Sequence, residues 1–162
     1  MKPPLHLPGL SLACALALTS TSNAAHFDVT LTATASGVTR KAGMDESPPI
    51  GGFNKRPVLQ ARAGEPIRIE FMMTNVYTHD AFIDSGVRYY IVKERETGQK
   101  PVPPLEGAPV EGSFSFALKP QAKIAVRTRV AITEPGIYLL RVESVNTQRD
   151  HEHFSAIDLD IR

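Results

Sequence analysis

Hydrophobic and polar residues alternate along most of the chain beyond residue 26. Between Phe27 and Ala35 an apolar side chain occupies every second position, with an aspartate and three threonines between them. Residues 67–74 and 124–132 show the same period of two. Successive side chains of a β-strand point to opposite faces, so this pattern is typical of strands with one buried face. No window of ten or more residues has a convincing helical period, and the pattern therefore predicts an all-β protein.

Shorter apolar runs extend this pattern. Turn residues separate many of the runs: Ala63-Gly64-Glu65-Pro66 and Glu134-Pro135-Gly136 each mark a tight break, and four prolines between residues 101 and 109 exclude a central strand there. Residues 36–56 carry Gly, Pro and charge without an apolar pattern, and we expect a long surface loop or a partly mobile insertion there. About eight strands predict a two-sheet antiparallel sandwich over residues 26–162. The five shorter strands are expected at residues 58–63, 87–94, 114–118, 137–145 and 154–161.

The first 25 residues have a different character. Lys2 is their only charge, and an apolar run over residues 10–18 is followed by polar residues and then by Ala24-Ala25. A basic start, a short apolar run and small residues at its end are typical of a secretory signal peptide. The run has about nine residues, fewer than the ~20 that span a bilayer. We therefore expect residues 1–25 to be a signal peptide, cleaved to leave Ala25 or His26 first, and a periplasmic or secreted protein without a transmembrane segment.

Export changes the inventory of reactive groups. The only cysteine, Cys14, lies inside the apolar run, so the mature chain would have no disulfide, no thiolate nucleophile and no cysteine ligand for a metal. The chain has 18 basic and 17 acidic residues, and loss of Lys2 leaves 17 of each. Without a basic excess to neutralise phosphates, nucleic acid is not an expected partner. A protein or another envelope component is the expected partner instead.

Two segments resemble bacterial immunoglobulin-like domains. Residues 61–71, with Thr74-Asn75, look like the turn between the first two strands of such a domain and its second strand. Residues 134–142 look like the corner before its sixth strand, and Tyr138 lies where these domains place a tyrosine whose hydroxyl bonds nearby backbone. The resemblance covers roughly residues 57–162 and implies the sandwich fold. It implies little about function, because one fold carries many functions.

No familiar catalytic motif is present. The sequence has no G-x-S-x-G, H-E-x-x-H, P-loop or G-x-G-x-x-G pattern. We therefore expect no enzymatic activity and name no catalytic or cofactor-binding residue. The sequence favours an exported, non-catalytic binding or accessory module of the cell envelope.

Histidines suggest an alternative function. His151-Glu152-His153 would place two imidazoles on the same side of an extended segment just before the last strand, and His79 lies in the loop after the second immunoglobulin-like strand. In an immunoglobulin sandwich these two loops lie at the same end. His79, His151 and His153 could then gather with nearby aspartates to bind Cu or Zn. The simpler interpretation is a set of solvated polar loops.

His26, at or next to the new terminus, supports the metal hypothesis through a second resemblance. Periplasmic copper-resistance chaperones use such a histidine, and this chain is similar to them in size and export. The resemblance implies a copper or zinc carrier, although the methionine-rich loop of some of these proteins is absent. Apart from Cu or Zn under this hypothesis, no cofactor is expected.

Aromatic residues define a rival binding surface. Phe53, Tyr77, Phe82 and Tyr90 lie in or near expected loops, or on the solvent side of a strand. Aromatic side chains in such places are common in interfaces. Tyr90 and Phe82 could instead complete a second layer of the core.

Overall fold

The computed structural model describes residues 27–43, 56–79, 82–100, 102–104, 107–145 and 153–162. The predicted signal peptide, His26 and His151 lie outside these residues. Nine strands and no helix occur in the described part, which accordingly has no helix of the length and hydrophobicity needed to cross a bilayer. The strands are β1 (Phe27–Ala35), β2 (Val38–Ala42), β3 (Val58–Ala61), β4 (Pro66–Asn75), β5 (Phe82–Glu94), β6 (Val110–Leu118), β7 (Lys123–Ala131), β8 (Gly136–Val145) and β9 (Phe154–Ile161).

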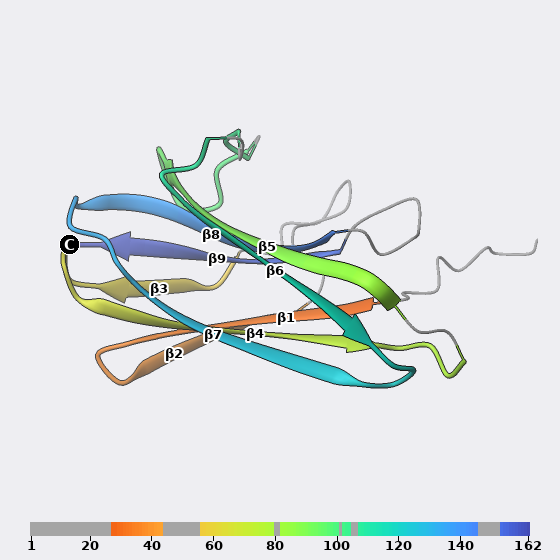
Figure 1. Ribbon diagram of the computed structural model, residues 1–162. Helices are drawn as coiled ribbons and strands as arrows, with labels where there is room; N and C mark the ends of the chain where they lie inside the picture. The colour runs from red at the N-terminus through yellow and green to blue at the C-terminus, as the bar shows by residue number, and fades with distance from the viewer. Residues whose placement is uncertain (1–26, 44–55, 80–81, 101, 105–106, 146–152) are drawn as a thin grey trace, which may run out of the picture.

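The strands form two sheets that face each other (Figure 1). One sheet has the order β2-β1-β4-β7, and the other has the order β3-β9-β8-β5-β6. The prediction of an all-β, two-sheet sandwich is confirmed, and the arrangement is compatible with an immunoglobulin-like fold. The pairings are antiparallel, as the predicted sandwich implies, except that β3 pairs with β9 in parallel. A parallel pair needs a long connection between its strands, and here almost the whole domain supplies it.

The prediction of a long loop over residues 36–56 is wrong at its start, where the chain forms a short strand. Val38–Ala42 forms β2, which pairs antiparallel with β1 through a two-residue turn. Ser36 and Gly37 in that turn have φ angles of 48° and 77°. Positive φ at both central residues is the geometry that matches the twist of a β-hairpin. Residues 44–55 of the expected loop lie outside the described residues.

A single apolar core fills the space between the sheets. The inward positions are those that the period of two predicts: Met73 is fully buried on β4, whereas Met72 on the opposite face is only half-buried. β7 differs, because its inward side chains are half-buried and leave that side of the sandwich less closed. The largest fully buried members of the core are Leu31, Leu59, Ile67, Ile69, Phe71, Met73, Ile91, Leu140, Ile157 and Leu159.

Tyr138 confirms the predicted corner before β8. Its side chain belongs to the core, and its hydroxyl donates a hydrogen bond to the backbone carbonyl of Glu134 at 3.0 Å. Gly136 has a φ of 149° and lies between these two residues, where a Cβ atom would be 3.2 Å from Lys93 Cε. The corner therefore fixes the start of β8 and with it the register of the five-stranded sheet.

The five-stranded sheet is covered in part on its outer face as well. Val92, Leu139 and Ala156 form a second small cluster there, on β5, β8 and β9. Val102 and Ala108, from the connection between β5 and β6, pack against it. This connection therefore lies over the face of the sheet that is turned away from the main core.

Candidate functional site

The structure places two of the four candidate metal ligands. His79 is exposed in the connection between β4 and β5, and His153 directly precedes β9. The register pairs Gly86 with Val145 and Phe154 with Glu143, so the start of β5 and the start of β9 lie at the same end of the sandwich. The topology on which the metal hypothesis depends is thus present.

His153 itself differs from the expected exposed loop residue. Only 3 % of it is exposed, its backbone N–H donates to Ser144 Oγ at 2.9 Å, and its carbonyl accepts from Ser144 N–H at 2.8 Å. The described residues contain no group of three or more His, Cys, Asp or Glu side chains that could hold a metal ion. The shared site of His26, His79, His151 and His153 stays a prediction, because His26 and His151 lie outside the described part.

The expected aromatic surface is not assembled by the residues that the structure describes. Tyr90 is buried on the outer face of the five-stranded sheet, where its hydroxyl donates to Glu143 Oε1 at 3.0 Å. Tyr77 is half-buried and packs against the main core. Phe53 and the side chain of Phe82 lie outside the described part.

The sequence pattern missed a different aromatic group. Phe71 of β4, Tyr89 of β5 and Phe114 of β6 lie with their ring centroids 5.9 to 6.3 Å apart. Gly112 lies across from Tyr89 on β6, and a Cβ atom there would be 2.2 Å from Tyr89 Cε1. Phe114 remains 39 % exposed at the edge of the sheet. An apolar, partly open side therefore lies next to β6.

The outer face of the four-stranded sheet carries a concentration of positive charge. Its side chains alternate with the core residues of β1, β4 and β7, so the register defines them. They include five basic and two acidic residues, and their formal charge is +3 in a chain whose whole charge is +1. The basic ones are Lys41, Arg68, Lys123, Arg127 and Arg129, and the acidic ones are Asp28 and Glu70.

Two arginines are direct neighbours on this face. Arg68 of β4 pairs with Arg129 of β7 in the register of the sheet. The Cβ atoms of such partners are about 5 Å apart, and like charges in this position destabilise a sheet. Within the described residues, no carboxylate forms an ion pair with either guanidinium. In the next row Arg127 is neutralised by an ion pair with Glu70.

Threonines complete the row. Thr34 of β1 lies on the other side of Arg68, and Thr39 of β2 pairs with Thr34, their hydroxyl oxygens 2.9 Å apart. A hollow of about 670 Å³ extends over these residues. Its lining consists of Thr32, Thr34, Thr39, Arg68, Ile69, Glu70, Arg127, Thr128 and Arg129. We call this surface, centred on Arg68 and Arg129, the arginine–threonine face.

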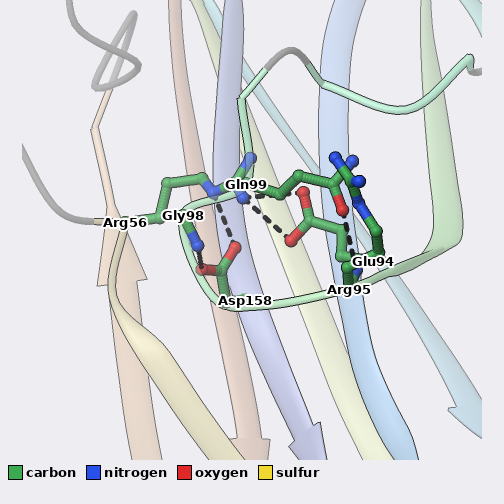
Figure 2. A network of polar contacts seen from close by, with 6 residues as sticks. All are labelled: Arg56, Glu94, Arg95, Gly98, Gln99 and Asp158. Carbon is green, nitrogen blue, oxygen red and sulfur yellow. Dashed lines mark hydrogen bonds and ion pairs between the residues drawn. The ribbon is translucent and has the colours of Figure 1, made fainter.

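A buried polar network lies on the other sheet (Figure 2). Arg56 Nη2 donates to both carboxylate oxygens of Glu94 at 2.7 and 2.8 Å, and Arg56 Nε lies 2.6 Å from Asp158 Oδ1. The backbone N–H of Gly98 donates to Asp158 Oδ2 at 2.6 Å. The side chains of Arg56, Glu94 and Asp158 are at most 5 % exposed. The network therefore anchors the start of the β5–β6 connection instead of offering groups to a ligand.

Burial dominates the charge balance of this network. Loss of solvation raises the pKa of Glu94 to about 7, although the positive charge of Arg56 opposes the shift. The same cause raises the pKa of Asp158. Two carboxylates share one guanidinium, so the ionised network has an excess negative charge away from water, which is costly.

Comparisons with known proteins assign no relative to this chain. No family model matches the sequence, and no curated protein matches it.

Proposed function

We propose that this protein is an exported, non-catalytic binding module of the cell envelope. Its arginine–threonine face would bind a polymer that carries repeated carboxylate or phosphate groups. The observation that supports this most strongly is the direct pairing of Arg68 with Arg129, without an acid to neutralise them in the described part of the chain. The signal-like first 25 residues support the envelope location.

The chemistry of the face favours oxyanions. A guanidinium is planar and can donate two parallel hydrogen bonds to one carboxylate or phosphate. An anion between Arg68 and Arg129 would turn their mutual repulsion into attraction. The hydroxyls of Thr34 and Thr39 lie in the same row and can donate to a second oxygen or to a sugar hydroxyl.

The same face makes two other ligand classes less suitable. None of its outward side chains is aromatic, so the stacking platforms that single-stranded nucleic acid needs are absent from it. The paired arginines would remain unneutralised beneath a neutral ligand, because such a ligand brings no charge. A charged, flexible polymer fits the extended and open shape of the hollow.

Binding to polymers of defined charge tests the proposal. Calorimetric titration should show binding of polygalacturonate, a carboxylate polymer, or of long-chain polyphosphate, and no binding of neutral dextran. The affinity should fall as salt is added, because the charges are exposed and screened. The variant Arg68→Ala/Arg129→Ala should bind about tenfold more weakly or worse, since tenfold corresponds to only about 1.4 kcal/mol.

A charge-matched control separates this site from general attraction. Arg88→Ala/Arg95→Ala removes two exposed arginines from the part of the molecule formed by the other sheet and should leave the affinity nearly unchanged. Equal losses in both double variants would contradict a defined site. Equal binding of dextran and the charged polymers would contradict the recognition of anions.

A metal carrier is the second candidate function. The observation that favours it is the topology, which brings the connections containing His79 and His153 to the same end of the sandwich. His151 and His26 would complete the set. Neutral imidazoles suit Cu(II) and Zn.

Thermal unfolding tests the metal candidate. Excess Cu(II) or Zn should raise the thermal midpoint, because a ligand that binds only the native state stabilises it. The effect should disappear below about pH 6, where protons compete for the imidazoles. His79→Ala/His151→Ala should abolish the shift, and an unchanged midpoint at excess metal would exclude this function. His153 is avoided in the test because it is buried, and its replacement would itself alter stability.

A further inference from the structure

Four strands form the edges of the two sheets, and three of them carry features that discourage pairing with another chain. β3 has four residues and β2 has five, and short edge strands offer few free backbone groups. β7 presents Lys123, Arg127 and Arg129 along its outer side. Charged side chains, lysine above all, protect an edge strand because pairing would crowd them.

β6 is the exception among these edges. It has nine residues, contains no lysine, arginine or proline, and carries a single charge at Glu111. At about 3.4 Å per residue it presents roughly 30 Å of edge. Phe114 at its centre is 39 % exposed, and it continues the aromatic group of Phe71 and Tyr89. An unprotected edge next to an exposed aromatic ring is a template for strand addition.

The sequence of β6 indicates which strand it fits. Read antiparallel to itself about Phe114, Val110 faces Leu118, and Gly112 faces Phe116. Glu111 then faces Ala117 and not another acid, and two small residues, Ser113 and Ser115, face each other. Each position therefore meets a compatible partner when the strand is paired with its own copy.

We propose that two copies of this chain pair through β6 about a twofold axis at Phe114, which joins their five-stranded sheets into one. This proposal is independent of the arginine–threonine face, which lies on the other sheet. The two Phe114 rings would lie directly opposite each other, and aromatic pairs in this position stabilise antiparallel strands. Nine paired residues would supply roughly one backbone hydrogen bond per residue.

Gly112 gives the register a steric basis. The ring of Tyr89 already fills the space above Gly112 on the inner side. Phe116 of the second copy would lie opposite Gly112 and would meet the Tyr89 ring, not a side chain of its direct partner. A register shifted by two residues, about Ser115, would place Phe116 opposite Phe114 and Leu118 opposite Gly112. Of these two registers, the one about Phe114 is the one that brings an aromatic ring to Gly112 and the Tyr89 ring, and it is the register that we propose.

Sedimentation velocity over a concentration series tests the association. The purified protein should shift from monomer to dimer as its concentration rises. Ser113→Lys/Ser115→Lys places four lysines around the twofold axis and should raise the dissociation constant about tenfold or more. Both serines are exposed, so the fold should be retained, as circular dichroism can verify.

Two further variants test the register itself. Ala117→Lys should tighten the dimer, because the lysine would face Glu111 of the second copy. The matched control Thr39→Lys, on the edge of the other sheet, should leave the association unchanged. A weaker dimer with Ala117→Lys would exclude the symmetric register.

Oxidative crosslinking gives an independent readout. Directly opposite residues of antiparallel strands have Cα atoms about 4.5 or 5.5 Å apart, within the range of a disulfide. In a Cys14→Ser background, Phe114→Cys should crosslink two copies much faster than Ser113→Cys. In the proposed register the two Phe114 positions face each other, whereas Ser113 faces Ser115 of the second copy. Equal rates, or a protein that stays monomeric at every concentration, would overturn the proposal. A monomer that instead binds a synthetic β6 peptide would indicate that the edge accepts a strand from another protein.

Discussion

At the scale of single residues, Arg56 is the centre of the buried polar network. It contacts both Glu94 and Asp158 at sites that are almost free of solvent. Its guanidinium is the only positive charge that contacts these two carboxylates in the described network. A substitution of Arg56 should therefore disturb the packing of β5 and β9. It should also disturb the β5–β6 connection, because Gly98 of that connection donates a hydrogen bond to Asp158.

Replacing Arg56 should destabilise the fold strongly. Arg56→Met preserves much of the volume but leaves two buried carboxylates without a counter-charge, which typically costs about 3–5 kcal/mol. Urea unfolding at pH 7.5 measures this loss. The control Arg95→Met changes an exposed arginine in the same region and should remain within about 0.5 kcal/mol of the wild type. Equal effects of the two substitutions would show that the network contributes little.

Glu94 should give the protein an unusual dependence on pH. Its pKa in the folded state is raised to about 7 from an ordinary value of 4.5, so between these pH values the folded state binds more protons than the unfolded state. The free energy of unfolding should therefore decrease as the pH rises from about 4.5 to 7. The raised pKa of Asp158 acts in the same direction.

Urea unfolding at pH 5 and pH 8 measures this effect. Because of Glu94, the free energy of unfolding of the wild type should be higher at pH 5 than at pH 8. The Glu94→Gln variant cannot release a proton at this position, so its free energy of unfolding should depend less on pH. An identical slope in the variant and the wild type would assign the dependence to other groups.

At the scale of elements, the β1–β2 hairpin supplies the edge strand β2 of the four-stranded sheet. β2 pairs only with β1 in the described part of the chain, and it adds Thr39 to the arginine–threonine face. The hairpin depends on a turn of two residues, Ser36 and Gly37, that both have positive φ. Ser36 Oγ also donates to Glu65 Oε1 at 2.5 Å and thereby connects the turn to the start of β4. The pKa of Glu65 is lowered by the hydrogen bond from the backbone N–H of Arg62 and, to a smaller extent, by this bond from Ser36.

A side chain at Gly37 should weaken this hairpin. Gly37→Ala meets no neighbouring atom within 4 Å, so its cost arises from the positive φ alone, about 1–2 kcal/mol. Hydrogen exchange should show faster exchange in β2 with little change in the five-stranded sheet. A matched replacement at Gly98, which also has positive φ and open space, should leave β2 unaffected.

At the scale of the whole molecule, the last strand holds an interior place. β9 lies between β3 and β8, so both of its edges are used. Deletion of residues 154–162 should leave β3 without a partner and remove Asp158 from the buried network. We expect the shortened chain to lose cooperative thermal unfolding, because Ile157, Leu159 and Ile161 also leave the core. A retained sharp transition would contradict this central role.

The whole-molecule pattern was largely predictable from the sequence because it depends on local alternation. Three of the strands follow from the period of two and five more from shorter apolar runs between turn residues, and Tyr138 follows from the residues around its corner. β2 was overlooked although the Ser36-Gly37 dipeptide is a turn signal. Asp158 reads as a solvent-facing residue of an alternating strand, but Arg56 and the β5–β6 connection, both distant in the sequence, contact it and it is buried. The pairing of Arg68 with Arg129 likewise depends on a register that joins distant strands, so no local pattern contains it.

The parallel pairing of β3 with β9 has a consequence for the order of events during synthesis. Gln60 and Asp160, which meet across this pair, are separated by 100 positions, and closing so long a segment makes folding slow. Until residues 154–161 have left the ribosome, β3 has no partner and the second sheet lacks an interior strand. We expect the nascent chain to remain without its native structure for that whole period. This delay is compatible with the export that we propose, because a secretory channel threads polypeptides that are still extended.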